Sequence, residues 1–178
     1  ALNLPAALHY SGLKLALEER MEDERHPLMI LGGHAAGSAP FIHGDTNACS
    51  NHGGLVDAVC LGDGIAWLKE FLPALHQART EGLSKRDFLR QTARRLAGTY
   101  VPSLYHHHYQ GTRLTAIQPA EEGIPNPVQG RTDSMETWWQ DYDGAYIQLS
   151  EEEEEETLPL SVGCVYRCRF CQTGWLRE

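Results

Sequence analysis

The sequence predicts an α/β fold, and three observations lead to this prediction. Short apolar runs at residues 28–31 and 55–61 are typical of buried strands in a parallel sheet. A glycine-rich turn at 62–64 follows the second run. Helical periodicity then extends over residues 65–78 and 85–97. Strand, loop, strand and helix in this order indicate helices packed on a parallel sheet.

Local signals define the predicted helices. An apolar stripe predicts a helix over residues 6–24. Pro73 predicts a kink in the helix that starts at residue 65, because proline removes one backbone hydrogen bond. Ser84, with Asp87 three residues later, resembles a capping box that opens the helix at 85–97.

We expect residues 99–156 to form an irregular connector, because prolines interrupt any helical or strand periodicity there. Short strands are expected at 113–117 and 146–149. Six consecutive glutamates at 151–156 indicate a solvated loop, since like charges at this density repel. One further short strand, at 158–162, leads into the cysteine-rich end of the sequence.

Composition narrows the class of protein. The chain has 178 residues, of which 42% are hydrophobic and 22% charged, as in ordinary globular domains. A net charge of −9 argues against a surface built for non-specific nucleic-acid binding. No membrane span or signal peptide is expected. Because the sequence does not begin with methionine, we expect a processed protein or a fragment.

The cysteines are distributed unevenly along the chain. Three of the five, Cys164, Cys168 and Cys171, fall within eight residues, whereas Cys49 and Cys60 stand alone. An odd count clustered in this way favours a metal site in a reducing compartment over a disulfide framework, so we expect a cytoplasmic protein. Cys60 lies in an apolar run and is expected to be a small buried side chain.

The C-x3-C-x2-C spacing of Cys164, Cys168 and Cys171 favours one shared metal centre. Structural zinc sites and iron–sulfur clusters normally use four protein ligands. Three ligands leave one coordination position open, and an open position is where a cosubstrate can bind. A zinc site that takes a fourth ligand from elsewhere is the alternative.

This spacing, with Phe170 directly before the last cysteine, resembles the signature of radical SAM enzymes, and residues 158–163 resemble that family's first barrel strand. The resemblance implies that Cys164, Cys168 and Cys171 bind a 4Fe-4S cluster and that S-adenosylmethionine binds its fourth iron. It also implies reductive cleavage to methionine and a 5′-deoxyadenosyl radical, with electrons from a donor such as flavodoxin or ferredoxin. Phe170 would then pack near the adenosyl group.

The N-terminal part resembles radical SAM proteins that carry a cobalamin-binding-like, Rossmann-like domain. The resemblance rests on four segments: Ile-Leu-Gly-Gly at 30–33, Val-Asp-Ala-Val at 56–59, Gly-Asp-Gly at 62–64 and Gly-Thr-Tyr-Val-Pro-Ser-Leu-Tyr at 98–105. The glutamate that usually follows Gly-Asp-Gly is Ile65 here, and the Asp-x-His-x-x-Gly loop that ligates cobalt is absent. We therefore do not expect cobalamin to bind.

The four glycines of these turns are still candidate cofactor-binding residues. Backbone amides in glycine-rich loops after strands can hold a phosphate or a nucleotide tail. The candidates are Gly32, Gly33, Gly62 and Gly64.

Histidines offer weaker metal candidates. Adjacent side chains in a strand point in different directions, so His106, His107 and His108 rarely ligate one ion together, and a polar connector is expected. The loop at 34–54 holds three further histidines and one cysteine, where a zinc site is a second possibility. These residues are His34, His43, Cys49 and His52.

The resemblance divides the chain into three parts. Residues 1–98 would form an incomplete Rossmann-like domain, 99–156 a connector, and 157–178 the start of a radical SAM domain. The predicted function is that of a radical SAM enzyme or a fragment of one, with an unassigned substrate. The alternatives are a small α/β binding module with a C-terminal zinc loop and a non-catalytic scaffold.

Overall fold

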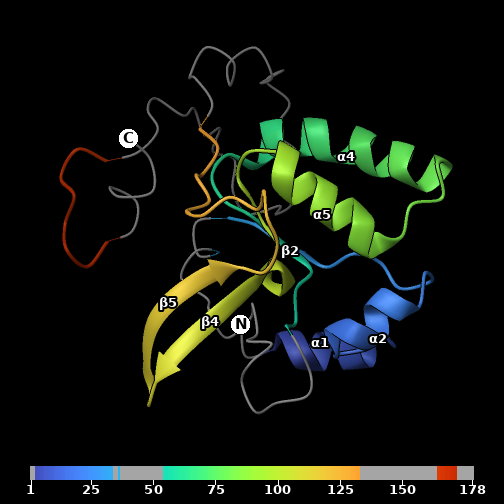
Figure 1. Cartoon of the computed structure of the whole chain (residues 1–178), viewed down its shortest axis with the longest axis horizontal. Helices are drawn as coiled ribbons and strands as arrows, with labels where there is room; N and C mark the ends of the chain where they lie inside the picture. The colour runs from blue at the N-terminus through green and yellow to red at the C-terminus, as the bar shows by residue number, and fades with distance from the viewer. Residues whose placement is uncertain (1–2, 34–35, 37–53, 133–163, 172–178) are drawn as a thin grey trace, which may run out of the picture. The chain divides into compact units, whose positions relative to one another are not determined.

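A computed structural model of the chain describes residues 3–33, 36, 54–132 and 164–171 (Figure 1). The chain forms two compact units, Ala1–Arg131 and Thr132–Glu178. The predicted strands at 146–149 and 158–162 and the acidic run at 151–156 lie outside the described residues. So does the loop that holds His34, His43, Cys49 and His52.

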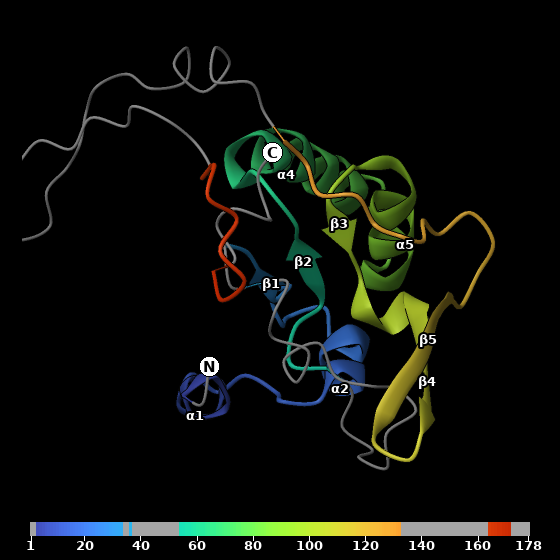
Figure 2. The ribbon, with the colours of Figure 1, turned by 90° about the vertical axis from the view of Figure 1, so that its left-hand side faces the viewer.

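A small mixed sheet lies at the centre of the first unit (Figure 2). Its strands are β1 (Ile30–Leu31), β2 (Ala58–Cys60) and β3 (Thr99–Tyr100), in the order β1-β2-β3. β1 and β2 are parallel, which confirms the predicted parallel pair. β3 runs antiparallel to β2, and the apolar pattern had not predicted it. The fold is therefore mixed α/β, with a central strand whose three residues are all buried.

Two long helices supply a cluster of large aromatic side chains to the core. They are α4 (Gly64–Thr80) and α5 (Lys85–Arg95), which confirms the helices predicted at 65–78 and 85–97, and α4 continues through Pro73. Trp67 stacks on Phe71 with ring centroids 4.2 Å apart, and Phe71 meets the edge of Phe88 at 5.3 Å. The indole nitrogen of Trp67 donates a hydrogen bond to Thr99 Oγ1 at 2.8 Å. The only hydrogen-bond donor of this large buried side chain therefore has a partner.

The predicted cap of α5 is confirmed. Ser84 Oγ accepts a hydrogen bond from the Asp87 amide at 3.1 Å and donates to the Asp87 carboxylate at 2.6 Å. The Ser84 hydroxyl lowers the pKa of Asp87, because it donates to the charged form. The start of this helix could therefore be predicted from two residues that are close together in the sequence.

The prediction of a single helix over residues 6–24 is wrong. The structure has two short helices, α1 (Leu4–Tyr10) and α2 (Leu17–Glu22). Gly12 separates them with φ of +71°, a left-handed conformation that glycine adopts without steric penalty, and its amide donates to the His9 carbonyl. A stripe of leucines continues across this break, and for this reason periodicity alone suggested one helix.

A hairpin follows the sheet within residues predicted to be an irregular connector. A 3-10 turn, η2 (Pro102–Leu104), leads into β4 (Tyr105–Gln110), which pairs antiparallel with β5 (Arg113–Pro119). β5 confirms the strand expected at 113–117. Figures 1 and 2 both show the hairpin projecting away from α4 and α5. Tyr105 anchors it, because this buried ring donates its hydroxyl to the Pro125 carbonyl at 2.7 Å.

Candidate metal centre and the glycine-rich edge of the sheet

The three clustered cysteines lie on one loop, described at residues 164–171. The amide of Cys171 donates to the carbonyl of Cys168 at 3.0 Å, so a tight turn brings the last two cysteines close along the backbone. Arg167, directly before Cys168, has φ of +41°, a left-handed conformation that is uncommon for residues other than glycine. Cys164 and Cys168 are exposed and Cys171 is partly buried.

The ligand chemistry of the loop fits a three-thiolate metal site. None of the four described cysteines is in a disulfide bond. Within residues 3–33, 36, 54–132 and 164–171, no three His, Cys, Asp or Glu side chains are grouped closely enough to hold one ion. The loop thus supplies the right number and type of donors, and it must close around a metal before the three sulfurs share a centre.

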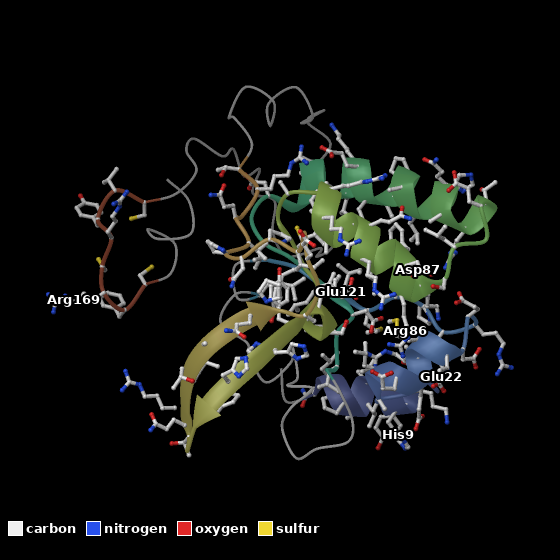
Figure 3. All side chains as sticks on the ribbon, in the orientation of Figure 1. His9, Glu22, Arg86, Asp87, Glu121 and Arg169 are labelled. Atoms are coloured by element: carbon white, nitrogen blue, oxygen red, sulfur yellow. The ribbon has the colours of Figure 1, made fainter. Side chains whose placement is uncertain are left out.

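Apolar and basic side chains surround the cysteines on this loop. Phe170 is 92% exposed, and Val165 and Tyr166 are nearly as open. Arg169 projects outward from the loop in Figure 3. The exposed ring of Phe170 lies next to Cys171 in the sequence, and its contact with an adenosyl group stays a prediction.

The candidate glycines gather at one edge of the sheet. β1 and β2 are parallel, so Gly32 and Gly33 after β1 lie at the same edge as Gly62 and Gly64 after β2. A Cβ placed on Gly32 would lie 3.9 Å from that of Cys60, an ordinary contact. No described atom lies within 4 Å of a Cβ placed on Gly33 or Gly64. Among the described residues, these two turns are not filled by neighbouring atoms.

Gly62 differs from the other candidate glycines, because the backbone of Arg131 packs directly against it. Its φ is +99°, and a Cβ placed there would lie 1.9 Å from the Arg131 carbonyl oxygen. Two backbone hydrogen bonds of 2.8 Å fix this approach, from Arg131 to Leu61 and from Asp63 to Arg131. The space beside Gly62 is therefore filled by protein backbone.

A buried ion pair, missed by the sequence reasoning, holds the opposite end of β2. Arg20 of α2 donates to Asp57 Oδ1 at 2.8 Å, and both side chains are completely buried. The other carboxylate oxygen of Asp57 accepts from the Met29 amide at 2.6 Å. Burial raises the pKa of Asp57, and the Met29 amide and the Arg20 guanidinium act against this rise. An aspartate inside an apolar run was the available signal, because a buried carboxylate needs a partner.

The polar cluster around this ion pair connects four helices and strands. Arg20 also donates to the carbonyl of Gly54 at 3.2 Å, just before β2. Lys85, at the start of α5, donates its ammonium to the carbonyls of Arg20 and Asp23, so it caps the end of α2. One polar cluster therefore positions α2, β1, β2 and α5 relative to each other.

The structure confirms the prediction that Cys60 is a small buried side chain. It belongs to β2 and is 4% exposed. Burial raises the pKa of this thiol to about 11, and the nearby charge of Asp63 adds to the rise. The neutral thiol is therefore the form present near neutral pH, and it has little nucleophilic reactivity.

We expect iodoacetamide at about pH 8 to modify Cys164 and Cys168 about tenfold faster, or more, than Cys60, because alkylation requires an accessible thiolate. Peptide mapping by mass spectrometry after timed quenching measures the rates. In concentrated urea, Cys60 should react as fast as the loop cysteines. Equal rates in the native protein would contradict the buried position of Cys60.

The described residues define a mixed α/β protein with three cysteines in C-x3-C-x2-C spacing on one loop. A family model described as "Radical SAM proteins, N-terminal" matches residues 1–102, which is more than half of the chain. The chain therefore belongs to this family, and the predicted relation to radical SAM proteins is confirmed at that level. No curated protein and no solved structure matches the chain. No helix among the described residues is long and apolar enough to cross a bilayer.

Proposed function

We propose that this chain is the N-terminal part of a radical SAM enzyme and includes its cluster-binding loop. In this proposal Cys164, Cys168 and Cys171 hold three irons of a 4Fe-4S cluster. S-adenosylmethionine, bound at the fourth iron, would supply the 5′-deoxyadenosyl radical after reduction by a donor such as flavodoxin or ferredoxin. The observation that carries the proposal is the C-x3-C-x2-C loop in a chain whose residues 1–102 match the radical SAM N-terminal family.

The accessibility of the loop supports this role. Cluster assembly requires thiols that iron and sulfide can reach, and Cys164 and Cys168 are both exposed. Phe170 would add an apolar surface for the adenosyl group on the same loop. Free thiols of this kind persist in a reducing compartment, which supports a cytoplasmic location.

For the N-terminal unit we propose a structural, Rossmann-like domain that does not bind cobalamin. The parallel pair of β1 and β2, followed by α4, supports the Rossmann-like part of this proposal. The backbone of Arg131 occupies the side of Gly62 that a phosphate would approach. Gly33 and Gly64 leave open space, so a different ligand at this edge of the sheet is compatible with the geometry.

The test is anaerobic reconstitution of the full chain with iron and sulfide. We expect about four irons per chain, a broad absorbance band near roughly 400 nm and an electron paramagnetic resonance signal after reduction with dithionite. Cys168→Ala should lose the band, because only two thiolates would remain. Cys60→Ala is the matched control, since this cysteine is buried in β2, and it should keep the cluster.

Other results of this experiment would overturn the proposal. A colourless protein that carries one zinc ion would identify the loop as a structural zinc site of a small binding module. A protein that takes up neither metal would favour a scaffold that keeps the fold without the cluster. Loss of the cluster in Cys60→Ala alone would exclude the loop as the ligand set.

A further inference from the structure

The histidine run at 106–108 lies on strand β4, which separates its three side chains between two faces. Neighbouring residues of a strand point to opposite sides, whereas residues two apart share a side. His107 faces the body of the unit, where its Nε2 lies 3.4 Å from the Tyr100 hydroxyl. His106 and His108 are both exposed and share the other face.

The partner strand leaves room on the face that His106 and His108 share. His106 pairs with Gln118 and His108 pairs with Ala116. The methyl group of Ala116 is small, so no bulky side chain stands directly across from His108. With a rise of about 3.3 Å per residue, the Cα atoms of the two histidines lie roughly 6.6 Å apart, a separation from which two imidazoles can reach one ion.

Gln118 orients one of the two rings. Its Oε1 lies 3.0 Å from Nε2 of His108. An amide oxygen only accepts hydrogen bonds, so Nε2 carries the proton and Nδ1 keeps its lone pair. Histidines that bind metals are usually held in this way, with the second ring nitrogen donating to a carbonyl or carboxylate oxygen.

From this arrangement we propose that His106 and His108 form a two-imidazole site for a divalent transition-metal ion, with Gln118 as a positioning residue. Imidazole nitrogen suits Cu²⁺, Ni²⁺ and Zn²⁺, and the general order of affinities places Cu²⁺ first. Water completes the coordination, because both histidines face solvent. The site is separate from the cysteine loop and does not depend on the proposed function.

Calorimetric titration with Ni²⁺ tests this site. The protein is the full chain carrying Cys164→Ala, Cys168→Ala and Cys171→Ala, so that loop thiols cannot bind the ion. We expect one Ni²⁺ per chain, and a further His106→Ala or His108→Ala should weaken binding about tenfold or more. Gln118→Ala should weaken it less, because the ring then loses only its orientation.

Two control variants separate this pair from the other histidines. His107→Ala changes the neighbour on the opposite face of β4, and His76→Ala changes an exposed histidine of α4. Both should bind Ni²⁺ as the parent does, and a circular dichroism spectrum checks that each variant is folded. Unchanged binding in His106→Ala, equal weakening in His107→Ala, or no binding by the parent would each overturn the proposal.

Discussion

Asp57→Asn is expected to lower the free energy of unfolding by about 3 to 5 kcal/mol. The substitution keeps the shape of the side chain and removes the charge that balances Arg20, whose guanidinium is completely buried. An unpaired buried charge is one of the most destabilising changes in a protein, because neither water nor a counter-ion compensates it. Urea denaturation followed by far-UV circular dichroism measures the effect.

A second Asp–Arg pair in the same unit provides the matched control. Asp23 and Arg25 lie 2.7 Å apart, almost the same separation as Arg20 and Asp57, but Arg25 is 90% exposed. Asp23→Asn should therefore shift the midpoint of urea denaturation much less than Asp57→Asn does. If both asparagine variants lost the same small amount of stability, burial would not explain the contribution of the Arg20–Asp57 pair to stability.

Removing both partners of the buried pair should be less harmful than removing one. A variant with Arg20→Met and Asp57→Leu leaves no buried charge, so it should be more stable than Asp57→Asn alone. The double variant also loses the hydrogen bonds to Met29 and Gly54, so its free energy of unfolding should remain lower than that of the parent protein. Comparison of the single and double variants separates the effect of charge from that of hydrogen bonding.

Gly62→Ala is expected to destabilise the first unit by at least about 2 kcal/mol. A methyl group at this position would overlap the Arg131 carbonyl, and the backbone conformation, with φ of +99°, is one that side chains rarely adopt. Relief of the overlap would move residue 131 and break its hydrogen bonds to Leu61 and Asp63. Urea denaturation again measures the change.

Gly64→Ala is the control two residues away. Gly64 is the first residue of α4, and no described atom would contact the added methyl group. Alanine favours helix more than glycine does, so this variant should be neutral or more stable by up to about 1 kcal/mol. A large loss in Gly64→Ala, or none in Gly62→Ala, would contradict the close approach of Arg131 to Gly62.

Strong local signals account for the parts of the fold that the sequence predicted. Ser84 and Asp87 lie three residues apart, and their hydrogen bonds begin α5 without help from distant residues. The apolar runs at β1 and β2 indicate strands, and the two strands do form a parallel pair. β2 is buried as expected, whereas β1 is only partly buried because it lies at the edge of the sheet. By contrast, the break at Gly12 was missed because apolar side chains continue on both sides of it.

Cys164, Cys168 and Cys171 are the candidate site that the sequence by itself determined, since metal chemistry depends on ligand type and spacing within eight residues. The α/β class was determined in the same way, through local periodicity, whereas the antiparallel strand β3 that makes the sheet mixed was not predicted. Only the tertiary structure decided the pairing of Arg20 with Asp57, the closure of Gly62 by Arg131 and the shared face of His106 and His108. The first two join residues that are 37 and 69 positions apart. The third requires residues 105–110 to form a strand, where the sequence predicted an irregular connector. Local sequence patterns do not predict such contacts, because they form only when folding brings together charged side chains and backbone groups that are far apart in the sequence.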